Sequence, residues 1–554
     1  MQGGGLTMQA ISGSNGVMLA FDLDDHARAG CLGFALERTD HTENGQTYWL
    51  RGFKTFRSIE PHPDPATWYT LRDHPLQTFT WGDYSAKPDH DYTYRVVPRF
   101  GQPGSLTDHV GLDLSVSIST SDPDRGTHGV YFNRGVAASQ AYLNRFKDPP
   151  DQLPPAKRAE AMEWLSRGLS EALLAFIGKA NSERFALRAA VYEFTFDPVL
   201  QAFGEAAAAG ADVEILYHAD GEQGASNLDA IQRTGITGLV RERHPHTLGH
   251  NKFIVLCETD GATLTPIAVW TGSTNITEGA IFGHSNVGHV VRRPDVAARY
   301  LMLWEQLSNN PPIEDLRDWT EQRDPFPPPE PAPATATIFS PRHGLAPLRW
   351  YAEGFSRARS TTNITCAFGL STLFEEGLQD AVAAGSPAIH YVLLDKADDH
   401  QDTWAADTVV FVAVGSSGGP DSLSIWGKER LTGFNHWVPF LHTKVLLVDA
   451  LSTKPLVITG SANFSPASTS SNDENMLVIT GDTRIADVYF TEFARIFQHM
   501  YARYWAKRLA EGGQPSDEHS FLRENDDWMA PYFATGNPKA LQRIALTTRV
   551  EGNE

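Results

Sequence analysis

The sequence predicts an α/β protein with two duplicated lobes, each a sheet flanked by helices, preceded by a small all-β sandwich. Three observations lead to this prediction. Short alternating strands fill the start of the chain, the remainder repeats one order of strands and helices, and a proline-rich segment separates the repeats. The predicted units are a β-sandwich over 1–120, a first lobe over 121–322, a linker over 323–341, a second lobe over 342–510 and a C-terminal extension over 511–554.

The sandwich is predicted from strands whose apolar and polar residues alternate. Tyr92–Phe100 (YTYRVVPRF) and Leu112–Ile118 (LDLSVSI) show this alternation, and Gly, Pro and Asp interrupt the pattern at short intervals. Such a series is typical of a small antiparallel sandwich. The segment Asp89–Gly101 also resembles a late strand of a fibronectin type III domain, a likeness that implies nothing about function.

The two lobes are predicted from segments that repeat each other. Ala186–Asp220 and Thr362–Lys396 both read as strand, helix, a glycine that stops the helix, and a second strand. Each repeat later ends in an amphipathic helix, at Pro294–Leu307 and at Arg484–Trp505. Strands that alternate with helices in this way favour an α/β sheet in each half.

Two further segments complete the predicted organisation. Residues 133–185 look helical, because Leu165–Ala180 places apolar residues three and four positions apart. The prolines of Arg323–Pro341 favour extended, unpacked backbone, which makes this segment the predicted linker.

Composition narrows the classes of function. The chain has 554 residues and a formal net charge of -21, which disfavours binding along a long nucleic-acid duplex. Its three cysteines, Cys31, Cys257 and Cys366, are far apart and are expected to pack as reduced side chains. Because no CxxC or HExxH pattern occurs, we predict neither a metal nor a cofactor.

The sequence also bears on location. No secretory leader and no run of about 18 apolar residues is visible, so a cytoplasmic protein is expected. Secretion stays open for a chain whose leader has been removed.

The strongest chemical signal is a pair of motifs that occurs once in each repeat. The first copy is His250–Cys257 (HNKFIVLC) followed by a Gly-Ser-x-Asn turn at Gly272, and the second is His442–Asp449 (HTKVLLVD) followed by the same turn at Gly460. From each of these glycines the next fourteen residues align without a gap, which places Asn286 opposite Glu474.

The spacing within each copy has a physical reason. In a strand, residues two apart point to the same face, so each His and its Lys project together. Two lysines and two asparagines can hold an anion, while two histidines can supply a nucleophile and a proton donor. This set suits cleavage of a phosphodiester without a metal. The candidate residues are His250, Lys252, Ser273 and Asn275 in the first copy, and His442, Lys444, Ser461 and Asn463 in the second.

These residues resemble the paired HKD motifs of the phospholipase D superfamily, and the likeness covers about residues 130–510. The resemblance implies duplicated phospholipase D-like lobes with mixed sheets, and one site shared between them. It also implies that one His attacks phosphorus, that the other protonates the leaving oxygen, and that Glu474 bonds a catalytic His. We assign His250 as nucleophile and His442 as general acid, although the reverse assignment is chemically reasonable.

The resemblance divides the site into two groups. Implied catalytic residues are His250, Lys252, Asn275, His442, Lys444, Asn463 and Glu474. Implied substrate-binding residues are Ser273, Ser461, Asn286 and Asp449.

The first copy departs from the family pattern at two positions. Cys257 stands where the family has Asp, and Asn286 stands where a carboxylate is common. The motif Asp is not the nucleophile, so its loss need not abolish catalysis. Cys257 ends an apolar strand, where Cys usually serves packing.

The motifs do not identify the substrate. The first hypothesis is an enzyme that hydrolyses phospholipid headgroups, or transfers them to an alcohol, at a membrane surface. The alternative is a nuclease or nucleic-acid phosphodiesterase that acts on single-stranded substrate, and a non-catalytic binding relic is the third. The basic segment Arg241–His250 could meet phosphates, and the aromatic residues of Ser424–His442 could contact acyl chains or bases. Because both motif copies lie in one chain, we expect a monomer.

Overall fold

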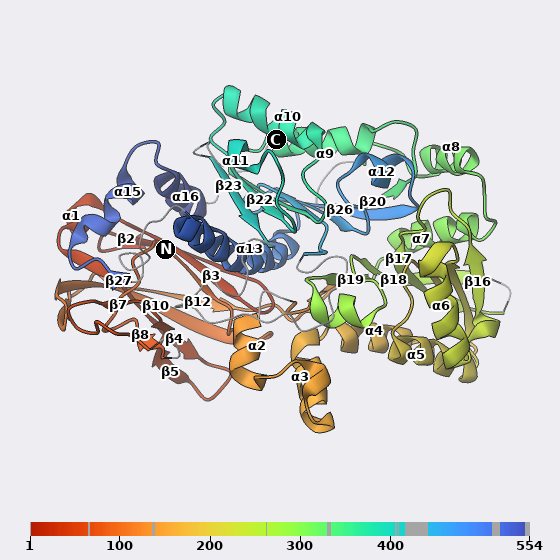
Figure 1. The fold of residues 1–554 in the computed structure, drawn as a ribbon, viewed down its shortest axis with the longest axis horizontal. Coiled ribbons are helices and arrows are strands. Elements are labelled where there is room, and N and C mark those ends of the chain that lie inside the picture. The colour runs from red at the N-terminus through yellow and green to blue at the C-terminus, as the bar shows by residue number, and fades with distance from the viewer. Residues whose placement is uncertain are drawn as a thin grey trace.

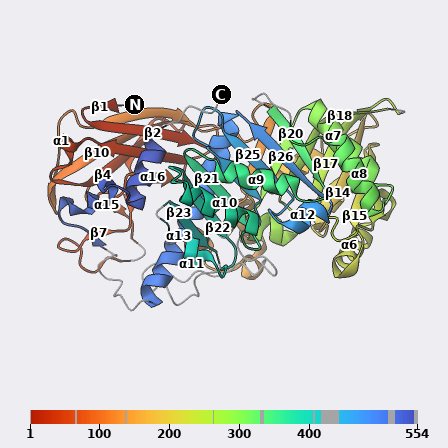
Figure 2. The ribbon, with the colours of Figure 1, turned by 90° about the horizontal axis from the view of Figure 1, so that it is seen from above.

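The computed structural model describes residues 2–64, 67–135, 139–261, 263–328, 334–404, 407, 409–415, 441–511 and 521–548. Figure 1 shows three regions: a β-rich region at the left, one α/β lobe at the right and a second above the centre. In Figure 2 the second lobe lies between the other two regions.

The N-terminal region is a sandwich of two antiparallel sheets, as predicted. One sheet has the order β1-β2-β3-β9 and the other the order β11-β10-β4-β5, with β12 also paired to β10. Phe21, Phe34 and Tyr94 are fully buried in the core between them. Its likeness to a fibronectin type III domain stays a prediction. The strands are β1 (Gln2–Gly3), β2 (Leu6–Ser12), β3 (Val17–Leu23), β4 (Cys31–Asp40), β5 (Gln46–Trp49), β9 (Thr80–Asp83), β10 (Asp91–Gln102), β11 (Ser105–Asp108) and β12 (Leu114–Ser119).

The two lobes contain seven-stranded sheets with the same topology, which confirms the predicted duplication. Their orders are β13-β19-β18-β17-β14-β15-β16 and β20-β26-β25-β24-β21-β22-β23. Three strands of each sheet are parallel and the others antiparallel, so both sheets are mixed. The first sheet comprises β13 (His128–Phe132), β14 (Phe185–Val191), β15 (Asp212–His218), β16 (Val240–Arg243), β17 (Lys252–Thr259), β18 (Leu264–Gly272) and β19 (Val287–Val291). The second comprises β20 (Ala334–Ser340), β21 (Thr361–Cys366), β22 (Ile389–Leu394), β23 (Val410–Val414), β24 (Val445–Val448), β25 (Leu456–Gly460) and β26 (Glu474–Thr480).

Helices flank both sheets (Figure 1). The first lobe has α2 (Ser139–Phe146), α3 (Pro155–Ser166), α4 (Leu169–Ile177), α5 (Asp197–Ala208), α6 (Gly221–Thr234), α7 (Pro294–Leu307) and α8 (Ile313–Arg323). The second has α9 (Ala346–Ser356), α10 (Thr372–Ala383), α11 (Gln401–Trp404), α12 (Pro466–Ser470) and α13 (Thr483–Glu511). Among the described residues, no helix combines the length and the apolar character needed to cross a bilayer.

Two local predictions need correction. The helix expected across Leu165–Ala180 is interrupted, because Arg167 and Gly168 take left-handed backbone with φ of 51° and 92° between α3 and α4. The predicted linker 323–341 includes β20, which pairs with β26 along its whole length. Alternating Ala and Thr give this segment a strand pattern that its preceding prolines obscure. The domain boundaries otherwise stay predictions.

The C-terminal segment packs against the sandwich. Strand β27 (Phe521–Leu522) pairs with β7 (Thr55–Phe56), and the Trp528 indole donates to the carbonyl of Cys31 at 2.9 Å. Trp528 and Tyr532 enter the sandwich core, so the last residues complete a domain formed mainly by the first ones. The segment also contains α15 (Ala530–Phe533) and α16 (Pro538–Thr547).

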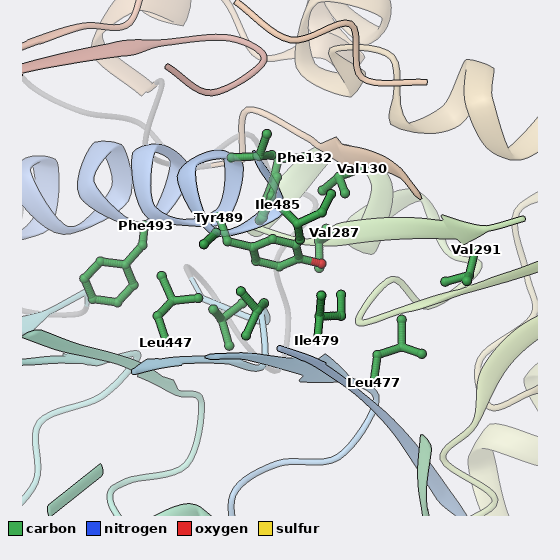
Figure 3. Close-up of a cluster of buried hydrophobic side chains, with 14 of the residues drawn as sticks. Val130, Phe132, Val287, Val291, Leu447, Leu477, Ile479, Ile485, Tyr489 and Phe493 are labelled. Carbon is green, nitrogen blue, oxygen red and sulfur yellow. The ribbon is translucent and has the colours of Figure 1, made fainter. Parts of the chain in front are cut away.

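Helix α13 joins the two lobes. One hydrophobic core extends across both sheets, and α13 lies within it (Figure 3). Tyr489 points from this helix into the space between Val287 of the first sheet and Leu477 and Ile479 of the second. Burial of this apolar surface stabilises the placement of one lobe on the other, at about 25 cal/mol per Å².

A polar chain crosses the same junction. His128 Nδ1 lies 2.9 Å from His289 Nε2, and His128 Nε2 lies 3.1 Å from the Thr335 hydroxyl of β20. The other ring nitrogen of His289 lies 2.9 Å from the Tyr489 hydroxyl. Burial lowers the pKa of His128 to about 4 and that of His289 well below 6.5. The pair is therefore neutral in the folded protein near pH 7.

We expect this pair to make stability depend on pH. In the unfolded chain these histidines take up protons near pH 6.5, whereas in the folded chain His128 does so near pH 4 and the pKa of His289 is also well below 6.5. The free energy of unfolding should therefore fall as pH drops from 6.5 to 4, by about 1.4 kcal/mol per unit for each buried histidine. Unfolding monitored at several pH values should show a shallower slope for His128→Gln. An equal change in slope for His62→Gln, at an exposed position, would contradict this origin.

Candidate active site

The two His-x-Lys pairs take the same local geometry. In each pair the Lys Nζ donates to the carbonyl of its own His, at 2.7 Å for Lys252 and 2.7 Å for Lys444. All four side chains are buried, with exposures between 1 and 6%. Lys252 begins β17 and Lys444 directly precedes β24, the equivalent central strand. The spacing of two thus places both polar side chains of each motif at the same end of the strand, as the sequence predicts.

Backbone contacts link each motif to the opposite lobe. The Asp473 amide donates to the Leu248 carbonyl at 2.9 Å, and the His442 amide donates to the Ser285 carbonyl at 3.1 Å. Isolated bridges pair Gly249 with Asp473 and Ser285 with Leu441. The segment before each motif histidine therefore lies against the other lobe, and the two motifs form one site.

The partner of His250 comes from the second lobe. His250 Nδ1 lies 2.9 and 3.0 Å from the two carboxylate oxygens of Glu474. Ser461 donates to Glu474 at 2.7 Å and accepts from the Asn475 amide at 3.0 Å. The backbone donor directs the hydroxyl proton to the carboxylate. Glu474 thus fixes the proton of His250 on Nδ1 and leaves the Nε2 lone pair available.

The partner of His442 comes from the first lobe in the same way. His442 Nδ1 lies 3.0 Å from Asn286 Oδ1, which also accepts from Ser273 at 2.8 Å. Ser273 accepts from the Val287 amide at 3.1 Å, and the Asn286 amide group donates to the Ala280 carbonyl at 2.8 Å. The two histidines differ in one respect: a carboxylate holds His250, and a neutral amide holds His442.

The two motif glycines allow these serines to lie so close to the neighbouring strand. Gly272 has φ of 135°, and a Cβ there would overlap the Val287 carbonyl. A Cβ at Gly460 would likewise overlap the Asn475 carbonyl. The Gly-Ser pair is therefore required for the serine to bond Asn286 or Glu474.

Burial dominates the electrostatics of the site. Burial lowers the pKa of His250 to about 4, although Glu474 opposes the shift. Burial and the charge of Lys444 lower the pKa of His442 well below 6.5. Burial also lowers the pKa of Lys252 to about 8 and that of Lys444 well below 10.5. Burial favours a neutral Glu474, but His250, Lys252 and Ser461 hold its pKa below the usual range.

The two asparagines of the Gly-Ser-x-Asn turns lie at this site in different states. The Asn275 amide group donates to Glu193 in a short hydrogen bond. Asn463 is only half-buried, and no carboxylate in the described part of the chain holds it. The Oδ1 atoms of Asn275 and Asn463 have no hydrogen-bond partner among the described residues.

Four residues assigned to substrate binding have other partners. Ser273, Ser461 and Asn286 use their polar atoms to hold the histidine partners described above. Asp449 lies at the opposite end of β24 from Lys444. It takes left-handed backbone with φ of 49° and accepts from the amides of Arg359 and Ser360 at 3.0 and 2.7 Å. A prediction from motif membership alone cannot separate residues that fix a strand end from residues that meet the substrate.

A comparison of the ends of β24 and β17 explains why Cys257 can stand at the position equivalent to Asp449. Strand β24 ends before Asp449, whereas β17 continues to Thr259, so Cys257 still pairs with Ala186 of β14, beside a register shift between β17 and β18. Cys257 is fully buried in the core, and burial raises the pKa of its thiol to about 12. The missing Asp is therefore a local change in strand length, remote from the histidines.

Several residues that contact the histidines or their partners are not among the predicted site residues. The Tyr192 ring lies 5.0 Å from that of His250, and His284 lies 5.0 Å from His442. Arg243 bonds Asp473, the neighbour of Glu474, at 2.8 and 3.2 Å in a buried pair. Tyr192 and Glu193 directly follow β14, and the Glu193 carbonyl accepts from the Ile276 amide at 3.0 Å. Their place at the site thus depends on contacts between distant segments.

The segments that lead to the motifs differ from expectation. In the basic segment before His250, Arg241 bonds Glu214, Arg243 bonds Asp473 and His244 bonds Asp220. These side chains are therefore engaged within the protein. The aromatic segment Ser424–His442 lies outside the described residues except for Leu441 and His442. Elsewhere, Glu375, Asp398 and His400 place three potential ligand atoms within 4.8 Å of one another, although such acidic groups are common without an ion.

We predict that Glu474→Gln lowers kcat about 10²–10⁴-fold, because the neutral amide no longer fixes and charges the His250 imidazole as a carboxylate does. The assay is turnover of bis(p-nitrophenyl) phosphate, with thermal melting to confirm folding. Ser461→Ala removes only one bond to Glu474 and should cost less. Wild-type kcat in Glu474→Gln would show that the contact does not serve the reaction.

We predict the opposite pattern for Asp449→Asn. The change weakens charged hydrogen bonds to the amides of Arg359 and Ser360, which should cost about 1–3 kcal/mol of stability. It should leave kcat within about twofold, because the side chain lies away from the histidines. Denaturant unfolding and turnover, measured together with Cys257→Ala as a second remote variant, check this. A large loss of kcat at unchanged stability would show that Asp449 acts in substrate binding or catalysis.

Comparisons with known proteins agree with this geometry. A family model described as cardiolipin synthase, PLD-like domain, matches residues 173–307 and 421–499, which hold the two motif copies. No curated protein gives a significant match. Similar solved structures include the phospholipase D family member Nuc from Salmonella typhimurium, with 24% identity over 26% of this chain and 87% of that one, and a TM-score of 0.22.

Two further structures cover more of the chain. Phosphatidylserine synthase from Haemophilus influenzae is 12% identical over 64% of this chain and 93% of its own, with a TM-score of 0.41. Yeast tyrosyl-DNA phosphodiesterase is 12% identical over 57% and 88%, with a TM-score of 0.33. Scores this low carry no argument about substrate. The paired motifs and the duplicated mixed sheets agree with the likeness to the phospholipase D superfamily that the family model indicates over its two matched segments.

Proposed function

We propose that this protein cleaves the headgroup phosphodiester of phospholipids through a phosphohistidine intermediate. The observation that carries the proposal is the crossed arrangement of the histidines. His250 is held by a carboxylate and His442 by an amide, so two otherwise equivalent imidazoles have different roles in proton transfer.

In the first step, the Nε2 lone pair of His250 attacks phosphorus. A P–N bond forms while the P–O bond to the headgroup alcohol breaks. His442, as imidazolium, donates its Nε2 proton to the leaving oxygen and becomes neutral. Lys252, Lys444 and the Asn463 amide offset charge on the phosphoryl oxygens.

His442 has to be protonated for this step, and binding of the anionic substrate favours that protonation. In the resting site its pKa is low because of burial and the charge of Lys444. An anionic phosphate offsets that charge and raises the pKa of the imidazole. Protonation of the general acid is thereby coupled to the arrival of the substrate.

In the second step, water or an alcohol attacks the phosphohistidine. Neutral His442 takes the proton from the attacking oxygen as a new P–O bond forms. The P–N bond breaks, and His250 leaves with its lone pair and with Nδ1 still bonded to Glu474. Water gives hydrolysis, and an alcohol gives transfer of the phosphatidyl group.

Three observations support a lipid over a nucleic acid. The chain carries a net charge of -21. Three cations before the first motif pair with Glu214, Asp473 and Asp220, so nearby carboxylates offset the positive charge that this segment would offer to a phosphate chain. The matching family model is described by a phospholipid enzyme.

The proposal predicts release of headgroup alcohol from phospholipid vesicles, measured on a panel of phosphatidylcholine, phosphatidylethanolamine and phosphatidylglycerol in the presence of EDTA. Because Lys252 and Lys444 supply the cationic charge, chelation should leave the rate unchanged. His250→Ala and His442→Ala should each lower kcat by at least about 10³-fold.

Trapping separates the roles of the two histidines. Acid quench of His442→Ala should leave labelled phosphohistidine, whereas His250→Ala should give none. The reverse result would exchange the roles. Cleavage of single-stranded DNA without cleavage of any lipid would replace the lipid proposal with a nuclease, and binding of both without turnover would make the site a binding relic.

A further inference from the structure

Glu193 is a carboxylate in the phosphate-binding part of the site that the reaction described above does not use. It lies two residues beyond the end of β14, and its carbonyl accepts from the Ile276 amide at 3.0 Å. A neighbouring bridge joins Phe194 to Ile276. The backbone of Glu193 is thus fixed to the turn that carries Asn275, and its position follows from the sheet.

The side chain of Glu193 occupies a donor that a phosphate would need. The Asn275 amide group donates to Glu193 in a short hydrogen bond, while Asn275 is 4% exposed and its Oδ1 has no partner among the described residues. Among the described residues, Glu193 thus accepts from the Asn275 amide group, while the amide oxygen has no donor. Glu193 itself is only partly buried, so it remains accessible to a ligand.

The charges around Glu193 are those of the anion site. Lys252 and Lys444 both favour its ionised form, against burial, which raises its pKa overall. Tyr192 is its chain neighbour, and the other titratable groups of the site include Glu474, His250, His442, His284 and Asp395. Glu193 thus places a second carboxylate, besides Glu474, close to the two lysines that would hold a phosphodiester.

In the described part of the second lobe, the position equivalent to Glu193 holds no acidic residue. Strand β21 ends at Cys366, and the residue two positions later is Phe368, which is 67% exposed. The turn asparagine on that side, Asn463, is not held by a carboxylate in the described part of the chain. The internal duplication thus shows that the sheet and the motifs form without an acidic residue at this place.

We propose that the Glu193 carboxylate competes with the substrate phosphate for the Asn275 amide and the two lysines, and so sets the affinity of the site for phosphodiesters. The inference builds on the phosphate-binding role proposed above. Protonation of Glu193 removes the competing charge, so the affinity for anions should rise as pH falls. The wild type and Glu193→Gln share all other titratable groups of the site, so the difference between them isolates the effect of Glu193 on anion affinity.

The test is titration calorimetry with sulfate, which stays a dianion over the pH range used. At pH 7, Glu193→Gln should bind sulfate about tenfold or more tightly than the wild type, because it keeps the shape of the side chain without its charge. At pH 5 the difference should shrink, since burial raises the pKa of wild-type Glu193 and so favours its neutral form as pH falls. Glu205→Gln, which removes an exposed carboxylate on α5 of the same lobe, is the matched control and should match the wild type.

A double variant tests whether Glu193 acts through the Asn275 amide. In an Asn275→Ala background the contested amide is gone, so the gain from Glu193→Gln should be smaller. Equal or weaker sulfate binding by Glu193→Gln, with an unchanged melting temperature, would overturn the inference. Because binding is measured without turnover, failure of the lipase assay with a tighter Glu193→Gln would reject the proposed reaction and leave the competition standing.

With substrate, Glu193→Gln should lower KM and change kcat much less. A loss confined to kcat would instead make Glu193 part of the chemical step.

Discussion

The hydrogen bond between His250 and Glu474 is the contact on which the site depends, because its two partners belong to different lobes. A buried imidazole can attack phosphorus only if its proton is fixed on the other nitrogen, and here the acceptor comes from a strand of the opposite sheet. The relative placement of the lobes is therefore as important as either motif. Helix α13, the polar chain through His128 and His289, and the Arg243–Asp473 pair all act on that placement.

This dependence accounts for the apolar core that the two sheets share. Tyr489 contacts both lobes within a single hydrophobic cluster, so a shift of one sheet disturbs packing on both sides (Figure 3). Close-packed interiors resist such shifts. The sandwich extends this rigid unit, since α13 also contacts β2 and the C-terminal Trp528 is inserted in the sandwich core. The chain thus surrounds the lobe junction with packed elements on several sides.

Much of the fold could be predicted because its signals are local. The His-x-Lys spacing, the repeated strand–helix–glycine order and the fourteen-residue alignment that places Asn286 opposite Glu474 all lie within short windows. The crossing of the partners could not be predicted, because it depends on how two distant sheets meet. The alignment names Asn286 and Glu474 as equivalent residues, but only the structure shows that each serves the histidine of the other copy.

Other features also lie outside short sequence windows. The assignment of Asp449, Ser273 and Ser461 to substrate binding rests on motif membership and stays a prediction, while the structure shows which partners these side chains have within the protein. Strand β20 was hidden by neighbouring prolines. Glu193 carried no motif at all: a carboxylate at a strand end is ordinary until the strand proves to end beside the turn that carries Asn275.

The duplication places the same framework on both sides of one phosphate and then changes single residues within it. Equivalent positions hold Glu474 and Asn286, Asp449 and Cys257, and Phe368 and Glu193. Only the first of these pairs changes the partner of a reacting imidazole, and that change alone separates a nucleophile from a proton donor. The second alters a strand end far from the histidines. The third puts a negative charge on one side of the phosphate, so the asymmetry of the site lies in its affinity for anions as well as in its proton transfer.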